Sequence, residues 1–149
     1  ARAAFEGLPL RLRYPQAIRP WQHVLDALRG YLMLAEAARS GVRVDEAWNL
    51  GPPETEALAV GEVVNAFMLA TGKSMPFELI EGDGKPEAAV LRLNTMKARE
   101  RLGWQTTLPI DRAVNMTALW YRGFYEGESA REMTARQIDA VFGAATSLS

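Results

Sequence analysis

Two hydrophobic patterns follow each other at the start of the chain. Leucines alternate with proline and arginine from Leu8 to Leu12, which is the two-residue period of a strand with one buried face. Tyr14-Pro15 ends this strand, because a residue before proline favours extended or turn geometry. We expect the chain to return as a second strand over Ile18 to Gln22.

Two longer stretches have the spacing of amphipathic helices. The first follows Gln22, and its apolar positions are three and four residues apart: Leu25, Leu28, Leu32, Ala35 and Ala38. The second has these residues on one face: Val60, Val63, Val64, Phe67 and Met68. Ser40-Gly41 and Thr71-Gly72 end the two helices. Gly30 destabilises the first helix by about 1 kcal/mol relative to alanine, and close approach of a neighbouring strand would explain it.

The remaining predicted elements are short. The sequence ARAAFEG is typical of the last turns of a helix, with Gly7 as its end. Strands are predicted at Ala47–Leu50, at Phe77–Ile80 and from Leu91. Short helices are predicted to begin near Glu54 and Glu56, to run from Asn94 or Thr95 to Leu102, and to follow the capping-box spacing of Thr134 and Gln137. We therefore predict an α/β fold with short strands and about five helices, in which residues 1–143 form one domain and residues 144–149 a frayed tail.

Composition excludes several classes of protein. The chain has 149 residues, of which 48% are hydrophobic, and a formal net charge of −1, so it lacks the basic excess of nucleic-acid-binding proteins. It contains no cysteine and one histidine, which excludes disulfides, thiolate metal sites and histidine-rich metal sites. No apolar run approaches the roughly 20 residues of a membrane span, and no signal peptide opens the sequence. We expect a cytoplasmic protein that binds neither nucleic acid nor membrane.

One arginine stands out beside the start of the first long helix. Arg19 precedes Pro20-Trp21, and a guanidinium at this place can direct two donors to an anionic oxygen. The adjoining helix N-terminus adds a partial positive charge and free backbone N–H groups. The residues alone leave two readings open, half of a phosphate-binding site or an ordinary solvated arginine.

Three segments, in order, carry a resemblance to a known family. They are IRPWQHVLDALRGYLMLAEA from Ile18, EAWNLGPPE from Glu46, and LRLNTMKARERLGWQTTLPIDRAVNMTALWYRGFY from Leu91. Together they resemble the C-terminal half of the extended short-chain dehydrogenase/reductases, over about Arg2 to Phe142. Within that family RPWQHV and EAWNLGP resemble the CDP-glucose 4,6-dehydratases most closely.

The resemblance implies a lyase reaction for the whole enzyme. NAD oxidises the hexose of a nucleotide-diphosphate sugar at C4, water is lost across C5 and C6, and the hydride returns to C6. The family needs a glycine-rich strand–helix turn for the NAD pyrophosphate and a Tyr-x-x-x-Lys pair. None of the four tyrosines has a lysine four residues later, and Gly51 is followed by two prolines. We therefore expect a C-terminal piece of a longer enzyme, inactive alone, with NAD bound by the missing N-terminal half.

The resemblance also implies roles for individual residues. Arg19 corresponds to the position that grips the substrate diphosphate, where a planar guanidinium suits bidentate binding. Lys85, in EGDGKPE, lies where relatives bring a second basic or polar group to the same phosphates. Leu10 and Arg11 lie on the strand that runs along the nucleotide base in relatives, mainly through backbone contacts. No catalytic, cofactor-binding or metal-binding residue is assigned to this chain.

Other prominent side chains have structural explanations. His23 has no serine, cysteine or acidic partner in a triad-like pattern, so we expect it to pack or to cap a helix. The four tryptophans are expected mainly in the core: Trp21, Trp48, Trp104 and Trp120.

Two alternative functions stay open at this point. The first is the C-terminal part of a UDP- or dTDP-sugar epimerase or dehydratase. The second is a stand-alone, non-enzymatic binding or interaction module that retains the fold. The resemblance implies that Ala47–Leu50 is a strand in the sheet of the NAD-binding half. If that half is missing, we expect Trp48 and Leu50 to lie at an unpaired sheet edge, which favours self-association.

Overall fold

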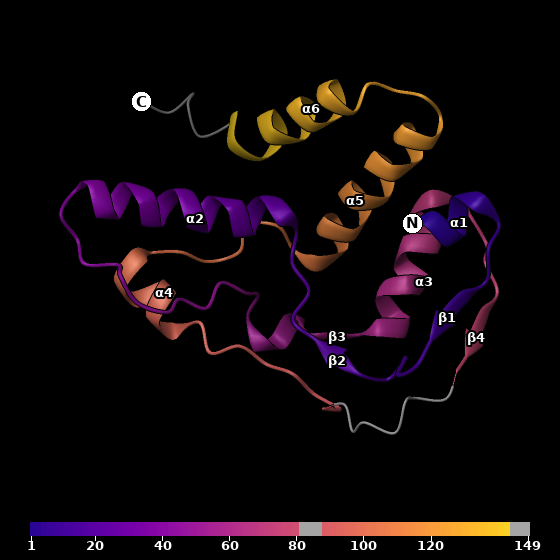
Figure 1. The fold of residues 1–149 in the computed structure, drawn as a ribbon, viewed down its shortest axis with the longest axis horizontal. Helices are drawn as coiled ribbons and strands as arrows, with labels where there is room; N and C mark the ends of the chain where they lie inside the picture. Colours follow the sequence, from indigo (N-terminus) through magenta and orange to yellow (C-terminus); the bar gives the residue numbers. More distant parts are fainter. Residues whose placement is uncertain (81–87, 144–149) are drawn as a thin grey trace. The chain divides into compact units, whose positions relative to one another are not determined.

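The computed structural model describes residues 1–80 and 88–143, which contain six α-helices and four short strands (Figure 1). The helices are α1 (Arg2–Glu6), α2 (Val24–Arg39), α3 (Val60–Thr71), α4 (Met96–Leu102), α5 (Ile110–Tyr125) and α6 (Ala130–Phe142). The strands are β1 (Leu10–Leu12), β2 (Ile18–Arg19), β3 (Leu58–Ala59) and β4 (Phe77–Leu79), and a 3-10 turn, η1, spans Glu54–Glu56. This arrangement confirms the predicted α/β class, with one helix more than expected.

The strands form two small sheets. β1 runs parallel to β4, with Leu10 opposite Phe77 and Leu12 opposite Leu79. β2 runs antiparallel to β3, with Arg19 opposite Leu58. The chain divides into two compact units, each built from separate stretches of sequence. Unit 1 contains residues 1–15, 61–86 and 114–149, and unit 2 contains residues 16–60 and 87–113.

Aromatic side chains hold the helices of unit 1 together. Phe67 of α3 meets Tyr121 of α5 edge to face, with ring centroids 6.4 Å apart, and Phe5 of α1 stacks on Tyr125 at 4.6 Å. The indole N–H of Trp120 donates to the hydroxyl of Thr134 and links α5 to α6. Aromatic contacts of this kind add to the free energy gained by burial alone.

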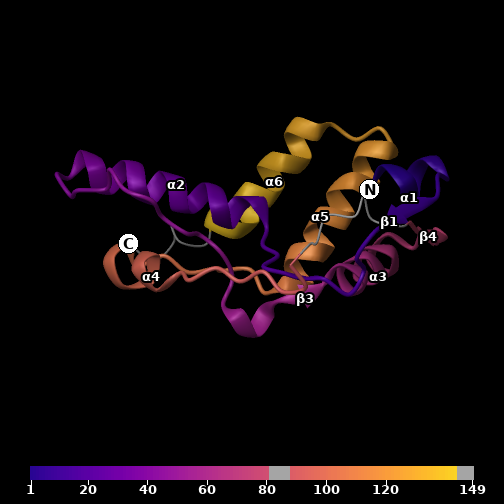
Figure 2. The same cartoon turned by 60° about the horizontal axis from the view of Figure 1, so that its bottom comes forward.

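The core of unit 2 lies beneath α2. Trp104 is 1% exposed, and its indole N–H donates to the backbone oxygen of Asp26. A Cβ on Gly30 would collide with a side-chain methyl of Leu50 and would lie 2.9 Å from Nε1 of Trp104. Close approach therefore explains this glycine, although the neighbouring segment is not a strand. Figures 1 and 2 both show α2 running above α4 and the segment that precedes η1.

The buried face of α2 differs from the predicted one. Leu25, Asp26 and Gly30 are buried, whereas Leu28 and Leu32 are 45% and 68% exposed. Asp26 turns inward because its carboxylate accepts hydrogen bonds from Thr107 and Leu108. The helix thus has an apolar row, as the spacing indicates, but unit 2 buries mainly its opposite side.

Three predicted strands differ from the structure. Ile18 to Gln22 is a strand only over Ile18–Arg19, because Pro20 has no N–H to continue the ladder. Ala47–Leu50 is not a strand, and no described strand pairs with it. The segment from Leu91 has only an isolated parallel bridge between Val90 and Ile18 at its start, where the N–H of Leu91 donates to the oxygen of Ile18. Their apolar spacing is present, but a strand also needs a neighbour to receive its backbone hydrogen bonds.

The last helix begins earlier than expected. Ser129 is its N-cap, and the Ser129 hydroxyl accepts a hydrogen bond from the N–H of Glu132. The capping residue is therefore Ser129 and not Thr134. Thr134 and Gln137 instead join α6 to α5. Thr134 accepts a hydrogen bond from Trp120, and Gln137 donates one to the backbone oxygen of Met116.

Candidate functional site

Arg19 lies at the end of β2 in unit 2, and it is half-buried. Its Nη1 donates to the backbone oxygens of Ile18, at 2.8 Å, and of Ala88, at 3.0 Å. Ala88 directly follows the EGDGKPE stretch in the sequence. The guanidinium is thus held by backbone oxygens of two segments that lie far apart in the sequence.

The other predicted site residues are distributed differently. Leu10 and Arg11 are neighbours on β1, in unit 1, where Arg11 forms an exposed ion pair with Glu78 of β4 at 3.6 Å. Arg19 belongs to unit 2, so it does not share a unit with Leu10 and Arg11. Lys85 lies outside the described residues.

His23 caps the helix that follows Arg19. It is 4% exposed, and its Nδ1 accepts a hydrogen bond from the N–H of Leu25 at 3.2 Å. Burial lowers the pKa of this imidazole below its ordinary value, against the opposing effect of the nearby Asp26 carboxylate. The capping role predicted for His23 is confirmed, and this role requires the neutral form with an unprotonated Nδ1.

A charged cluster surrounds Trp48. Lys97 and Arg101 lie over its indole ring, 4.7 and 5.3 Å from the centroid. Glu46 accepts from both cations, at 2.7 and 2.6 Å, and these hydrogen bonds hold the pKa of Glu46 below its ordinary value. Trp48 is half-buried in this cluster and is not a bare edge residue. Of the four tryptophans only Trp104 belongs to the fully buried core.

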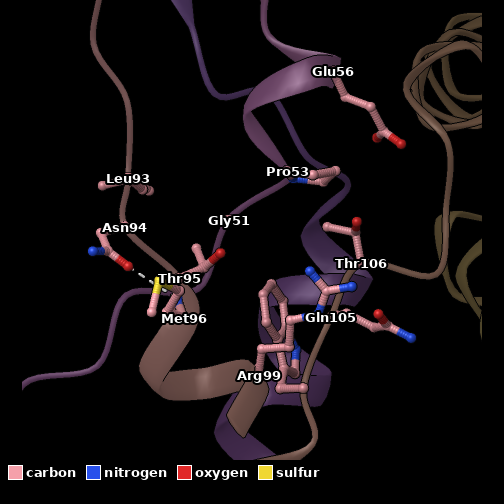
Figure 3. A pocket seen from close by; sticks show the side chains of 11 residues that line it. Gly51, Pro53, Glu56, Leu93, Asn94, Thr95, Met96, Arg99, Gln105 and Thr106 are labelled. Atoms are coloured by element: carbon pink, nitrogen blue, oxygen red, sulfur yellow. Dashed lines mark hydrogen bonds between the residues drawn. The ribbon is translucent and has the colours of Figure 1, made fainter.

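A cavity of about 550 Å³ lies in unit 2 between the Gly51–Pro53 loop and α4 (Figure 3). Its polar lining includes Glu56, Arg99, Gln105 and Thr106, while buried Trp104 forms part of the wall. Nothing in the sequence pattern indicated this cavity, because its residues come from three separate segments. It contains none of the predicted site residues.

The described residues offer no dinucleotide-binding turn around Gly51. A Cβ at Gly51 would lie 2.9 Å from a methyl carbon of Leu93, so the glycine accommodates packing. Pro52 and Pro53 follow it and have no N–H groups for a pyrophosphate. Within residues 1–80 and 88–143, histidine and acidic side chains form no group that could hold a metal ion. No helix of the described chain has the length and apolar character needed to cross a membrane.

The chain is similar in sequence and in fold to parts of known nucleotide-sugar enzymes. A CDP-glucose 4,6-dehydratase of Salmonella typhimurium is 31% identical to the chain over 137 residues, which cover 91% of the chain and 38% of that enzyme. The chain is a partial homologue of CDP-glucose 4,6-dehydratase. It therefore spans less than two fifths of the length of this curated relative. No protein-family model matches the sequence.

Solved structures agree on the fold. UDP-glucose-4-epimerase from Stenotrophomonas maltophila, with bound NAD and formylated UDP-arabinopyranose, has a TM-score of 0.70 at 23% identity, over 85% of this chain and 39% of its own. dTDP-glucose 4,6-dehydratase from Bacillus anthracis, in complex with NAD, has a TM-score of 0.65 at 23% identity, over 83% and 37%. The fold is that of the C-terminal portion of extended short-chain dehydrogenase/reductase epimerases and dehydratases, as the sequence segments predicted.

Proposed function

We propose that this chain is the part of an NAD-dependent, CDP-glucose 4,6-dehydratase-like enzyme that binds the nucleotide-diphosphate sugar. The observation that carries the proposal is the 31% identity to the Salmonella dehydratase, which extends over 91% of the chain. Arg19, Lys85, Leu10 and Arg11 are the proposed substrate-binding residues. None of them is proposed to take part in bond making or breaking.

Arg19 is proposed to bind the diphosphate. One of its terminal nitrogens donates to Ile18 and Ala88, which fixes the direction of the guanidinium. A guanidinium presents its N–H donors in one plane, which is the geometry that matches phosphate oxygens. A preorganised cation loses less side-chain entropy when the ligand binds.

Lys85 and β1 are the other proposed substrate contacts. Lys85 is three residues before Ala88 in the sequence, and Ala88 is hydrogen-bonded to Arg19. Its ammonium would add charge to the same diphosphate without the planar geometry of arginine. Leu10 and Arg11 would lie along the base through the backbone of β1, whose strand geometry exposes peptide groups at a regular spacing.

The chemical step is proposed to belong to residues outside this chain. NAD, bound by an N-terminal half that contributes the glycine-rich turn and the Tyr-x-x-x-Lys pair, would accept and return the hydride. The Gly51-Pro52-Pro53 loop cannot replace that turn, because its two prolines offer no N–H groups. The 149 residues alone are therefore proposed to be inactive.

Nucleotide competition on the gene product at its native length tests this function. We expect CDP-glucose to be converted to a 4-keto-6-deoxy sugar, and CDP to compete more strongly than UDP or dTDP. Stronger competition by UDP or dTDP would instead support the related epimerases and dehydratases. Absence of binding by all three nucleotides would reject the proposal and favour a non-enzymatic module.

A further inference from the structure

The segment that carries Arg19 is held on two sides within unit 2. On one side the N–H of Ile18 donates to the oxygen of Ala89 at 2.8 Å, and the N–H of Leu91 donates to the oxygen of Ile18 at 3.1 Å. On the other side β2 pairs with β3, where Arg19 lies opposite Leu58. Arg19 thus extends from the middle one of three adjacent segments.

The ladder between β2 and β3 is only two residues long, so it specifies its own register weakly. Register decides where Arg19 points, because a shift by one residue turns each side chain of a strand to the opposite face. Such a shift would carry the guanidinium away from the oxygen of Ala88, to which it donates at 3.0 Å. The direction of Arg19 therefore depends on contacts beyond the ladder itself.

Trp21 supplies one such contact. Its indole N–H donates at 3.0 Å to the backbone oxygen of Leu58, which is the β3 residue opposite Arg19. Its backbone N–H donates to the oxygen of Arg19 at 3.1 Å, so the chain turns at Pro20 directly after the arginine. Proline has no N–H to extend the ladder, and the side chain of Trp21 makes the next contact with β3 instead.

We infer that Trp21 is a positioning residue for substrate binding: its indole N–H fixes the register of β2 against β3 and thereby directs the Arg19 guanidinium toward the diphosphate. This inference rests on the proposed function, in which Arg19 binds that diphosphate. Trp21 itself does not contact the substrate in this role. The sequence favours a core position for this tryptophan, whereas the structure leaves it half-buried and gives its N–H a defined acceptor.

Stacking of Trp21 on the nucleotide or the sugar is the competing explanation. Stacking uses the flat face of the ring, which phenylalanine also has. Positioning uses the N–H, which phenylalanine lacks. The hydrogen bond to Leu58 favours positioning, because it ties the edge of the indole ring to β3. The two roles therefore give opposite results for Trp21→Phe.

Calorimetry with CDP on the gene product at its native length tests the inference. Trp21→Phe removes the N–H donor, and we expect CDP binding to weaken about fivefold, which corresponds to the loss of one ordinary hydrogen bond. The kcat at saturating CDP-glucose should stay unchanged, because Trp21 contacts no reacting atom in this role. Unchanged CDP binding in a folded Trp21→Phe protein would overturn the inference.

Trp120→Phe is the matched control. The indole N–H of Trp120 donates to Thr134 at the same distance of 3.0 Å, but in unit 1. We expect this variant to lower the thermal midpoint and to leave CDP binding unchanged. An equal loss of CDP binding in Trp120→Phe and Trp21→Phe would show a general effect of lower stability and would overturn the inference.

A double substitution shows whether Trp21 acts through Arg19. In an Arg19→Ala background we expect Trp21→Phe to change CDP binding by less than about twofold, because no guanidinium remains to be directed. The same loss in both backgrounds would overturn the inference. If Arg19→Ala alone leaves CDP binding unchanged, the proposed diphosphate site fails together with the inference. If Arg19→Ala weakens binding and Trp21→Phe does not, only the inference fails.

An isosteric replacement decides the result if Trp21→Phe does not fold. Benzothienylalanine in place of Trp21 exchanges the indole N–H for sulfur and keeps the shape of the ring, so the donor is lost while packing is preserved. We expect CDP binding to weaken about fivefold, with a thermal midpoint close to that of the unmodified protein. Unchanged affinity would assign Trp21 to packing or stacking and would overturn the inference.

Discussion

Asp26 holds Thr107 through two hydrogen bonds to a single carboxylate oxygen. The backbone N–H of Thr107 donates to Oδ1 at 2.9 Å and its hydroxyl at 2.8 Å, while the N–H of Leu108 donates to Oδ2 at 3.2 Å. Asp26 is fully buried. One acidic side chain on α2 thus fixes the turn that precedes α5, across about 80 residues of sequence.

The first prediction concerns this turn. Asp26→Ala leaves the N–H groups of Thr107 and Leu108 without acceptors, so we expect the free energy of unfolding to fall by about 2–4 kcal/mol. Thr107→Val removes only the hydroxyl donor and should lower it by about 1 kcal/mol. Urea denaturation followed by circular dichroism measures both changes. Equal effects of the two substitutions would show that the backbone hydrogen bonds contribute little.

The second prediction concerns the packing of α2 against Leu50. Gly30→Ala gains about 1 kcal/mol in helix propensity but places a methyl group against Leu50 and Trp104, and overpacking typically costs about 1–3 kcal/mol. We therefore expect a net loss of stability and a lower thermal midpoint. Leu50→Ala removes the colliding methyl groups, so Gly30→Ala should be less harmful in that background. If the two effects simply add, Leu50 is not the obstacle.

The third prediction concerns pH. Burial lowers the pKa of His23 in the folded chain, so the unfolded chain binds the proton more readily. Stability should be complete above the ordinary histidine pKa of about 6.5 and should decrease as pH falls through this value. Protonated Nδ1 could also no longer accept from Leu25. The free energy of unfolding, measured between about pH 7 and pH 5, provides the test.

His23→Asn is the matched control for this pH dependence. Asparagine is a good N-cap but does not titrate. We expect the variant to keep most of its stability near neutral pH and to lose the decrease that begins near pH 6.5. The same slope in both proteins would assign the effect to other groups.

The fourth prediction concerns Arg19 in the native-length enzyme. Arg19→Ala should weaken nucleotide-sugar binding by about 1.5–3 kcal/mol, the usual range for hydrogen bonds to charged groups. Arg19→Lys should recover part of this loss, because an ammonium restores the charge but not the planar donors. Arg43, an exposed arginine paired with Asp45, is the control, and Arg43→Ala should leave binding unchanged. Calorimetry with CDP-glucose would contradict the proposal if Arg19→Ala and Arg43→Ala behaved alike.

The fifth prediction concerns the cofactor. We expect residues 1–149 alone to show no saturable NAD binding in micromolar calorimetry, because Gly51 is followed by Pro52 and Pro53. Saturable binding would show that the chain contains a dinucleotide site that its sequence does not indicate.

Local signals in the sequence predicted most helix ends but not the packing of α2. Gly103 ends α4 with a φ of 67°, and Thr95 precedes its first residue, as expected. The inward position of Asp26 was not predictable, because it depends on donors from Thr107 and Leu108 far along the chain. The spacing of Leu28 and Leu32 predicted a helix correctly, but the prediction that this face is the buried one was wrong, since both leucines are exposed in the described structure.

Only part of the candidate site could be predicted from the sequence. The sequence segments that carry the family resemblance singled out Arg19, but its bond to Ala88 joins residues 69 positions apart. The cavity beside Arg99 gave no sequence signal, since Gly51, Met96 and Thr106 have no shared periodicity. Strands at Ala47–Leu50 and after Leu91 were wrong because pairing partners, and not local propensity, decide whether an apolar segment joins a sheet.

The interleaving of the two units has a consequence for synthesis on the ribosome. The chain passes between the units four times. β1 cannot form its ladder until β4 has been synthesised, because Phe77 of β4 lies opposite Leu10. Unit 2 likewise needs Trp104 and Thr107 before Asp26 of α2 has its hydrogen-bond partners. Neither unit can therefore complete its core while its early residues emerge, so the nascent polypeptide should stay open to proteases and chaperones until most of it has left the exit tunnel.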